Sequence, residues 1–284
     1  IPIGPYCNSP YACQFKSRCW SGISSPSVFD VVDLPIQRKF EYFFSNKIQI
    51  DNLEVSDFNH VKQKRQIACE LESLDFVNLS KLRSFIKGVS GPISFLDFES
   101  FQMPIPPFDG LSPYESIPFM FSVHVLDNNH LIDNQFIASP NVDPRLEVIK
   151  SLLSLLPANG SILVFNKSSE LNILDRLILY APSYSEQILS LKYRLVDLQL
   201  PFKHQWLYMR AFNGSCSIKS ILPAIDPSYS YDALEVSSGR LINMFYKQYL
   251  KSSDKTIVDK LKAYVKLDTY SMVVIYKFIS RIIG

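Results

Sequence analysis

Residues 93–99 read Ile93-Ser94-Phe95-Leu96-Asp97-Phe98-Glu99, and this stretch decides the fold that we expect. Its apolar run, bounded by Gly91-Pro92 and by a proline-rich turn, predicts a buried strand. Because strand side chains two apart share a face, Asp97 and Glu99 point the same way and Phe98 faces the opposite side. Two adjacent carboxylates repel each other and lose hydration, a cost that a divalent cation would remove. The stretch alone therefore leaves two interpretations open, a metal site and an acidic pair that merely meets water at a strand end.

The composition is that of an ordinary globular protein. A chain of 284 residues can bury one large core with an appendage or two small domains, and 47% hydrophobic with 20% charged residues fits either. The net charge of +2 neither demands nor excludes a nucleic-acid partner, because a basic groove can lie on a balanced whole. With no apolar run long enough to cross a bilayer and no signal-peptide pattern, we expect a cytoplasmic protein without a membrane partner.

Strands and helices are predicted to alternate through residues 91–284. The strands are expected at residues 92–101, 119–126, 131–138, 161–165 and 194–198. Asp127-Asn128-Asn129-His130 is a turn for an antiparallel pair. Asp143 is placed as the N-cap of a helix to residue 156, and a second helix spans 167–180, with helices from about residue 199 to the end. This order predicts an α/β fold of the ribonuclease-H-like kind, a mixed sheet flanked by helices.

The N-terminal segment carries Cys7, Cys13 and Cys19 at equal six-residue steps in a loop of small and turn-forming residues. Such thiols are typical metal ligands, for zinc or an iron–sulfur cluster, and both usually need four ligands. We expect the fourth ligand upstream of Ile1, the alternative being three incidental cysteines. The expected organisation is a cysteine-rich loop at 1–25 that ends a missing upstream module, a helical linker at 26–90, and the α/β domain at 91–284.

Two further pairs of polar residues have helical spacing. Asn166 and Glu170 lie four apart just beyond the strand at 161–165, and Tyr264 and Asp268 lie four apart near the end of the chain. Residues four apart share one face of a helix. Each pair alone also fits an ordinary helix: Asn166 as an N-cap with Glu170 near the positive end of the dipole, and Tyr264 with Asp268 on a solvated face.

Together the three motifs resemble the DEDD superfamily of proofreading-type (DnaQ-like) exonucleases. That superfamily has Asp-x-Glu on its first strand, Asn-x-x-x-Asp after the fourth and Tyr-x-x-x-Asp on the last helix. The corresponding residues are Asp97-x-Glu99, Asn166-x-x-x-Glu170 and Tyr264-x-x-x-Asp268, in the same order. The departure is Glu170, which is one methylene longer than the usual Asp.

A second resemblance covers nearly the whole chain. The motifs Phe95–Glu99, Pro113–Phe119, Asn166–Glu170, Val196–Leu198, Gly214–Lys219 and Asp268-Thr269 look like those of an uncharacterised bacterial family. In that family the domain follows a RecB-like nuclease module with iron–sulfur cysteines. The resemblance implies that the loop with Cys7, Cys13 and Cys19 ends such a module and that the full protein holds an iron–sulfur cluster.

The expected chemistry is hydrolysis of phosphodiester bonds of DNA or RNA by a 3′-to-5′ exonuclease with two Mg²⁺ or Mn²⁺ ions. Two such ions about 3.5 to 4 Å apart would clamp the attacking and leaving oxygens. Asp97, Glu99 and Asp268 are expected around one ion, with Asp97 also reaching the second and Glu170 acting there directly or through water. The superfamily resemblance assigns Tyr264 to orienting the attacking water.

Substrate contacts are expected from Phe98, by stacking on a terminal base, from Asn166, and from Lys219 at a phosphate. Each also has an ordinary interpretation, core packing for Phe98 and a solvated charge for Lys219. The expected partner is a single-stranded DNA or RNA end. Two other functions remain open, a nucleic-acid-binding or scaffold domain without turnover and hydrolysis of a smaller phosphodiester.

Overall fold

A mixed five-stranded sheet forms the centre of the larger of two units in the computed structural model, which describes residues 2–229 and 239–284. This unit comprises Arg83–Gln199 and the described residues from Ile225 to Gly284. Its strands are β2 (Ile93–Phe101), β3 (Ile117–Asp127), β4 (His130–Ile137), β5 (Ile162–Val164) and β6 (Leu195–Asp197). The spatial order is β4-β3-β2-β5-β6, with β2 antiparallel to β3 and parallel to β5. The α/β class and the five strands confirm the sequence-based prediction.

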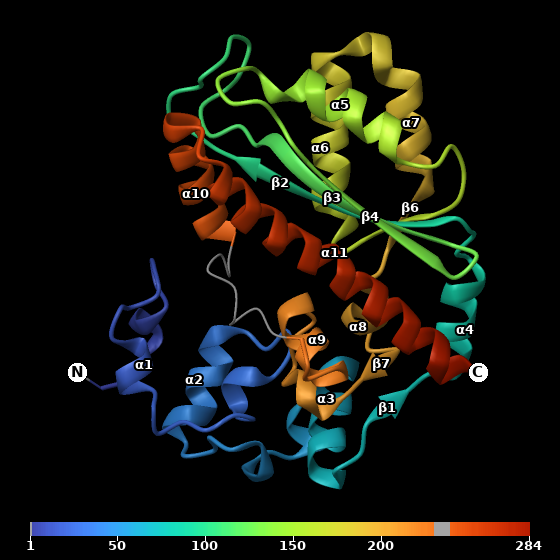
Figure 1. Ribbon diagram of the computed structural model, residues 1–284. Coiled ribbons are helices and arrows are strands. Elements are labelled where there is room, and N and C mark those ends of the chain that lie inside the picture. Colours follow the sequence, from blue (N-terminus) through green and yellow to red (C-terminus); the bar gives the residue numbers. More distant parts are fainter. Residues whose placement is uncertain (1, 230–238) are drawn as a thin grey trace. The chain divides into compact units, whose positions relative to one another are not determined.

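Helices cover both faces of this sheet (Figure 1). On one face lie α5 (Pro144–Leu155), α6 (Lys167–Tyr180) and α7 (Ser185–Arg194). On the other, α10 (Gly239–Ser252) packs against β2, and the long α11 (Lys255–Ile283) crosses β2, β3 and β4. The central strand β2 is therefore buried on both faces, which explains its nearly continuous apolar sequence.

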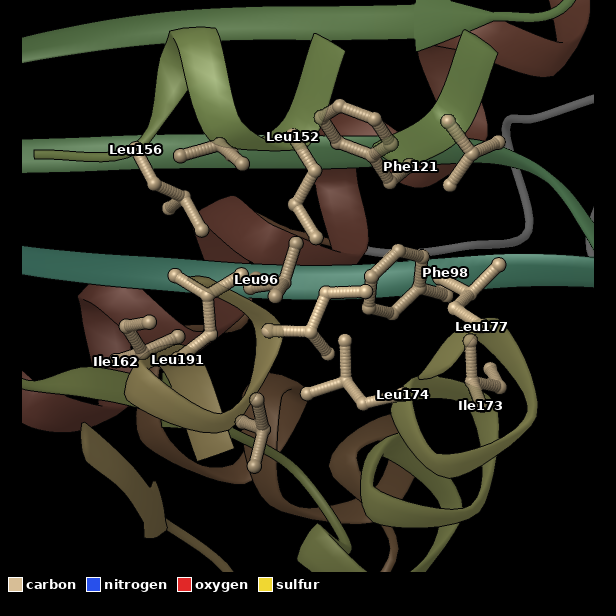
Figure 2. Close-up of a cluster of buried hydrophobic side chains, with 14 of the residues drawn as sticks. Leu96, Phe98, Phe121, Leu152, Leu156, Ile162, Ile173, Leu174, Leu177 and Leu191 are labelled. Atoms are coloured by element: carbon tan, nitrogen blue, oxygen red, sulfur yellow. The ribbon is translucent and has the colours of Figure 1, made fainter. Parts of the chain in front are cut away.

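Alternation along β2 sorts its side chains between these two layers. Leu96 and Phe98 enter a core with Leu152 of α5 and Leu174 of α6, as Figure 2 shows. Phe95 points to the other layer, where its ring lies 5.8 Å from that of Tyr276 on α11. Asp97 and Glu99 belong to the same face as Phe95, so the strand carries its two carboxylates toward α11.

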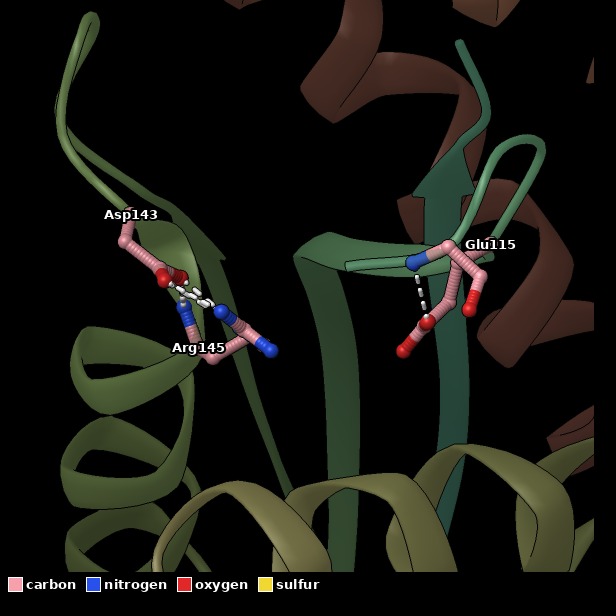
Figure 3. A network of polar contacts seen from close by, with 4 residues as sticks. Glu115, Asp143 and Arg145 are labelled. Atoms are coloured by element: carbon pink, nitrogen blue, oxygen red, sulfur yellow. Dashed lines mark hydrogen bonds and ion pairs between the residues drawn. The ribbon is translucent and has the colours of Figure 1, made fainter. Parts of the chain in front are cut away.

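The start of α5 is fixed by the predicted N-cap. The Asp143 side chain accepts a hydrogen bond from the backbone N–H of Arg145 at 3.1 Å and pairs with the Arg145 guanidinium at 2.6 Å (Figure 3). The Arg145 guanidinium also lies 3.8 Å from the ring centre of Tyr180 on α6. The cap therefore joins α5 to α6 as well as closing the first turn.

The connection between β2 and β3 is fastened to α6. Glu115 accepts a hydrogen bond from the backbone N–H of Ser112 at 3.0 Å (Figure 3). Glu115 also pairs with Arg176 of α6 at 3.1 Å. At the strand ends, the hydroxyls of Ser100 and Ser116 lie 2.6 Å apart. These contacts hold both ends of a proline-rich segment that follows Glu99 in the sequence.

The smaller unit combines the residues up to Leu82 with Leu200–Ala224. Its helices and strands are α1 (Lys16–Cys19), α2 (Ile36–Phe44), α3 (Val61–Glu72), β1 (Phe76–Val77), α8 (Leu200–Lys203), β7 (Leu207–Tyr208) and α9 (Ile218–Ile225, whose last residue belongs to the larger unit), while α4 (Leu79–Lys87) spans the boundary. β1 and β7 pair antiparallel, so the two segments share a small sheet.

This division corrects the predicted linker at 26–90 and the predicted domain at 91–284. Residues 26–82 bury a core of their own, made of Val28, Val31, Ile50, Leu53, Phe58 and Ile67. Residues 200–224, assigned from the sequence to the α/β domain, fold with that core instead. Among the described residues, the helices are all too short or too polar to cross a bilayer.

Candidate metal centre

Asp97 and Glu99 are on a strand whose register with its neighbour changes directly after Glu99. The register with β3 shifts between Glu99 and Ser100, which marks a β-bulge. Beyond the bulge, the Phe101 ring packs 5.2 Å from that of Tyr246 on α10. Bulges re-aim side chains and are common beside functional sites, so this irregularity fits the end of the strand that carries the acids.

The third acid comes from α11. Tyr264 and Asp268 lie one turn apart on this helix and are 4% and 8% exposed, so the turn is buried against the sheet. Carboxylate oxygens of Asp97, Glu99 and Asp268 all lie within 4.8 Å of one another. Among the described residues, no other group of three His, Cys, Asp or Glu side chains comes together in this way. Two of the three predicted motifs therefore converge in space.

Asp97 is strongly perturbed by its surroundings. Burial raises the pKa of Asp97 well above its usual range, and three neighbouring carboxylates raise that pKa further, those of Asp268, Glu170 and Glu99. All-oxygen clusters of this kind are the ligand set that Mg²⁺ and Mn²⁺ prefer, and a divalent ion would relieve both the repulsion and the lost hydration.

Glu170 approaches the cluster from the first turn of α6. Its side chain is 3% exposed, and burial, followed by the charge of Glu99, raises its pKa to about 8. The Oε2 atom of Glu170 is buried without a hydrogen-bond partner. Glu170 is outside the group of three whose oxygens all lie within 4.8 Å, but its charge reaches both Asp97 and Glu99. An unpartnered buried carboxylate oxygen beside other acids fits a cation.

Tyr264 is arranged as a hydrogen-bond donor rather than as a base. Burial and the charge of Asp268 raise the pKa of its hydroxyl, which also forms a hydrogen bond with the Asp268 carboxylate. The hydroxyl therefore keeps its proton at neutral pH, in agreement with the orienting role that the resemblance implies.

A polar network behind the acids was not found from the sequence. Thr269, next to Asp268, lies with its hydroxyl oxygen 2.7 Å from the Ser122 hydroxyl and 2.8 Å from Nδ1 of His124. Burial lowers the pKa of His124 to about 4, so this imidazole is neutral. Ser122 is paired with Asp97 across β2 and β3, so the strand register would locate this network. That register cannot be predicted from the sequence alone.

The predicted substrate residues have different outcomes. Phe98 is 7% exposed within the hydrophobic core, 5.8 Å from Phe121 between ring centres, so the stacking role predicted for it is wrong. Core packing on the face opposite the acids is the reason. Asn166 is exposed and has a left-handed backbone at the start of α6, where its N–H donates to Asp197 at 3.2 Å. Lys219 lies in α9 of the other unit, and its predicted phosphate contact stays a prediction.

The three cysteines of the N-terminal loop do not form a metal-ligand group in the part of the chain that the structure describes. Cys7 is buried, whereas Cys13 and Cys19 are exposed, and all three carry free thiols. Their sulfur atoms do not gather into a ligand group of the kind that the acids form among the described residues. An iron–sulfur or zinc site that takes its fourth ligand from upstream stays a prediction.

Comparison with known proteins gives one match. A family model described as a domain of unknown function (DUF2779) matches residues 94–217. The matched range includes Asp97, Glu99 and Glu170 but ends before α11, which supplies Tyr264 and Asp268. No curated protein and no solved structure matches this chain.

Proposed function

We propose that the larger unit is a metal-dependent exonuclease domain that hydrolyses phosphodiester bonds at a single-stranded DNA or RNA end. The observation that carries this proposal is the convergence of Asp97, Glu99 and Asp268, near the buried Glu170 carboxylate, one oxygen of which has no hydrogen-bond partner. Strand β2 and helix α11 supply these acids in the order and spacing of the DEDD superfamily that the motifs resemble.

The strand order supports a ribonuclease-H-like fold for this unit. Three antiparallel strands lead into two parallel strands joined through helices, and β2, the first strand of this sheet in sequence, lies at its centre. In this arrangement the acids of a central strand face a helix on one layer while the other layer forms the core.

The surroundings of each residue suggest a separate role for it in this reaction. Asp97, Glu99 and Asp268 would hold a divalent cation, with Asp97, whose pKa is raised by three neighbouring carboxylates, positioned to share it with Glu170. Bound Mg²⁺ or Mn²⁺ would supply a stronger nucleophile from water and stabilise the charge that develops on the phosphate. Tyr264 would donate its hydroxyl proton in a hydrogen bond that orients the water, as its raised pKa allows.

The decisive experiment follows degradation of 5′-labelled and 3′-labelled single-stranded DNA and RNA with Mn²⁺, with Mg²⁺ or with EDTA. We expect stepwise shortening from the 3′ end that requires metal and disappears in an Asp97→Asn/Asp268→Asn variant. The control is Asp259→Asn, which removes an exposed acid from the same helix and is expected to leave cleavage unchanged. Equal cleavage by the double variant and the wild type would refute the proposal.

A binding domain without turnover is the second candidate, and the surroundings of Glu170 favour it. A pKa of about 8 leaves this carboxyl largely protonated at neutral pH in the metal-free protein, which opposes recruitment of a second ion. The same experiment separates the two functions, because the binding domain would retain the labelled strands without shortening them in any metal.

A further inference from the structure

The side chain of Thr269 lies at the junction between the acids and the sheet. It is fully buried, as is Ser122, and His124 is only 2% exposed. Ser122 and His124 are on β3, two residues apart and hence on one face, and both contact the single hydroxyl of Thr269 on α11. Helix α11 and strand β3 are therefore joined by buried polar contacts.

The hydrogen bonds around Thr269 can all be satisfied together. A hydroxyl has one proton to donate and two lone pairs that accept. The Thr269 hydroxyl can donate to the carbonyl oxygen of Val265, 3.2 Å away in its own helix. Both lone pairs are then free to accept from Ser122 and from the Nδ1–H tautomer of His124. A saturated, buried network of this kind holds one geometry, because any displacement leaves a polar group unpaired.

The register places this network directly behind the metal centre. Ser122 is the Cα partner of Asp97 in the β2–β3 pair, and Thr269 is the residue that follows Asp268. The Thr269–Ser122 contact thus links the immediate neighbours of two acids from different elements. Sliding α11 by one residue would move Asp268 by about 1.5 Å along the helix axis and rotate it by about 100°, far outside any shared ligand geometry.

We propose that Thr269 is a positioning residue for the metal centre, and that its hydroxyl, held by Ser122 and His124, sets the position of Asp268 relative to Asp97. The inference rests on the proposed function only in requiring that these acids bind a divalent cation. It assigns to the network a role in cation affinity, beyond its contribution to the stability of the helix–sheet interface. Groups that orient metal ligands typically change metal affinity by 10- to 100-fold when they are removed.

The test compares Thr269→Val, which keeps the shape and removes the hydroxyl, with Thr269→Ser, which keeps the hydroxyl and removes a methyl group. Mn²⁺ affinity is measured on the whole chain by the electron paramagnetic resonance signal of free Mn²⁺, and folding by urea denaturation in EDTA. We expect the valine variant to bind Mn²⁺ at least 10-fold more weakly and the serine variant to stay within about threefold of the wild type.

A purely structural role would give a different pattern. If both variants lose urea resistance while each binds Mn²⁺ as the wild type does, the proposal is wrong, and it is equally wrong if the serine variant loses as much affinity as the valine variant. Should Thr269→Val fail to fold, Ser122→Ala replaces it, with the same 10-fold criterion. Wild-type protein that binds Mn²⁺ without cleaving nucleic acid would refute the proposed function and leave this inference intact, whereas wild-type protein that binds no Mn²⁺ would refute both.

Discussion

Replacement of Glu170 by Gln is expected to change the stability of the metal-free protein with a sign that depends on pH. The pKa of Glu170 rises from its usual 4.5 to about 8 in the fold, mainly through burial. Above pH 4.5 the unfolded chain gives up this proton while the folded chain keeps it up to about pH 8. Stability is therefore lost as pH rises through this window, by at most about 5 kcal/mol at about 1.4 kcal/mol per pKa unit.

The Glu170→Gln side chain cannot ionise, so the variant lacks this pH-dependent loss of stability. The substitution has a smaller destabilising effect of its own. A buried side-chain amide brings N–H donors into a site where one Glu170 oxygen already has no partner, at a cost of about 1 to 3 kcal/mol. In EDTA, we expect Glu170→Gln to be less stable than the wild type by about that amount at pH 4.5. At pH 8.5 the variant is expected to be more stable by about 2 to 4 kcal/mol.

Urea denaturation in EDTA at several pH values measures this crossing. Glu186→Gln is the matched control, because Glu186 is an exposed residue at the start of α7 and its replacement should leave the pH profile unchanged. A difference between Glu170→Gln and the wild type that stays constant from pH 4.5 to 8.5 would show that Glu170 ionises normally. Glu170 would then give no support for a cation at this site.

Three other substitutions probe the surroundings of the site. Phe98→Ala should lower the free energy of unfolding, measured by urea denaturation, by about 3 to 5 kcal/mol because it opens a cavity in the core. A decrease below about 1 kcal/mol would show that Phe98 is not a core residue. Asp143→Ala should cost about 1 to 2 kcal/mol by removing the N-cap of α5, and an unchanged thermal midpoint would contradict that role. His124→Asn should make the free energy of unfolding less dependent on pH below 6.5. In the fold the pKa of His124 is about 4 against the usual 6.5, so the wild type loses up to about 3 kcal/mol of stability as pH falls from 6.5 to 4. Parallel pH profiles of stability for variant and wild type would refute the burial of His124 as a neutral group.

Local sequence patterns were sufficient to predict most elements of the larger unit. An apolar run between turn signals predicts β2, and an Asp-Pro pair predicts the start of α5. These patterns depend only on residues a few positions apart, so they can be interpreted without knowledge of the tertiary structure. The same reasoning brought Asp97 and Glu99 to one face, and Tyr264 and Asp268 to one side of a helix.

The organisation of the smaller unit depends on contacts that no local pattern carries. Gly214 has φ of +73°, and a Cβ there would lie 2.1 Å from the carbonyl oxygen of Asp30. This close approach joins residues 184 positions apart in the sequence, so the glycine could be read only as an ordinary turn signal. Residues 26–90 are predicted as a linker, and the segment that folds with them, Leu200–Ala224, returns more than a hundred residues later in the chain.

Burial is the property of the site that the sequence did not reveal. Glu170 has the spacing of an ordinary helix start, and only the fold shows that its carboxylate is 97% removed from solvent with one oxygen unpaired. Thr269, Ser122 and His124 were overlooked for a similar reason. Each of these residue types is common in strands and helices, and the three side chains come together only through the pairing of β2 with β3 and the packing of α11.

The acids are brought together by packing that none of them provides. On β2, Phe95 packs against Tyr276 of α11 on one side of Asp97, while Leu96 and Phe98 pack in the core that holds α6. These apolar contacts fix three elements whose carboxylates repel one another, so the like charges remain close although their mutual interaction opposes it. An arrangement that is unfavourable by itself and maintained by rigid elements on both faces is preorganised for an opposite charge. The buried strand β2, from which the fold could be predicted, is therefore also the element that presents Asp97 and Glu99 to the cation that we propose.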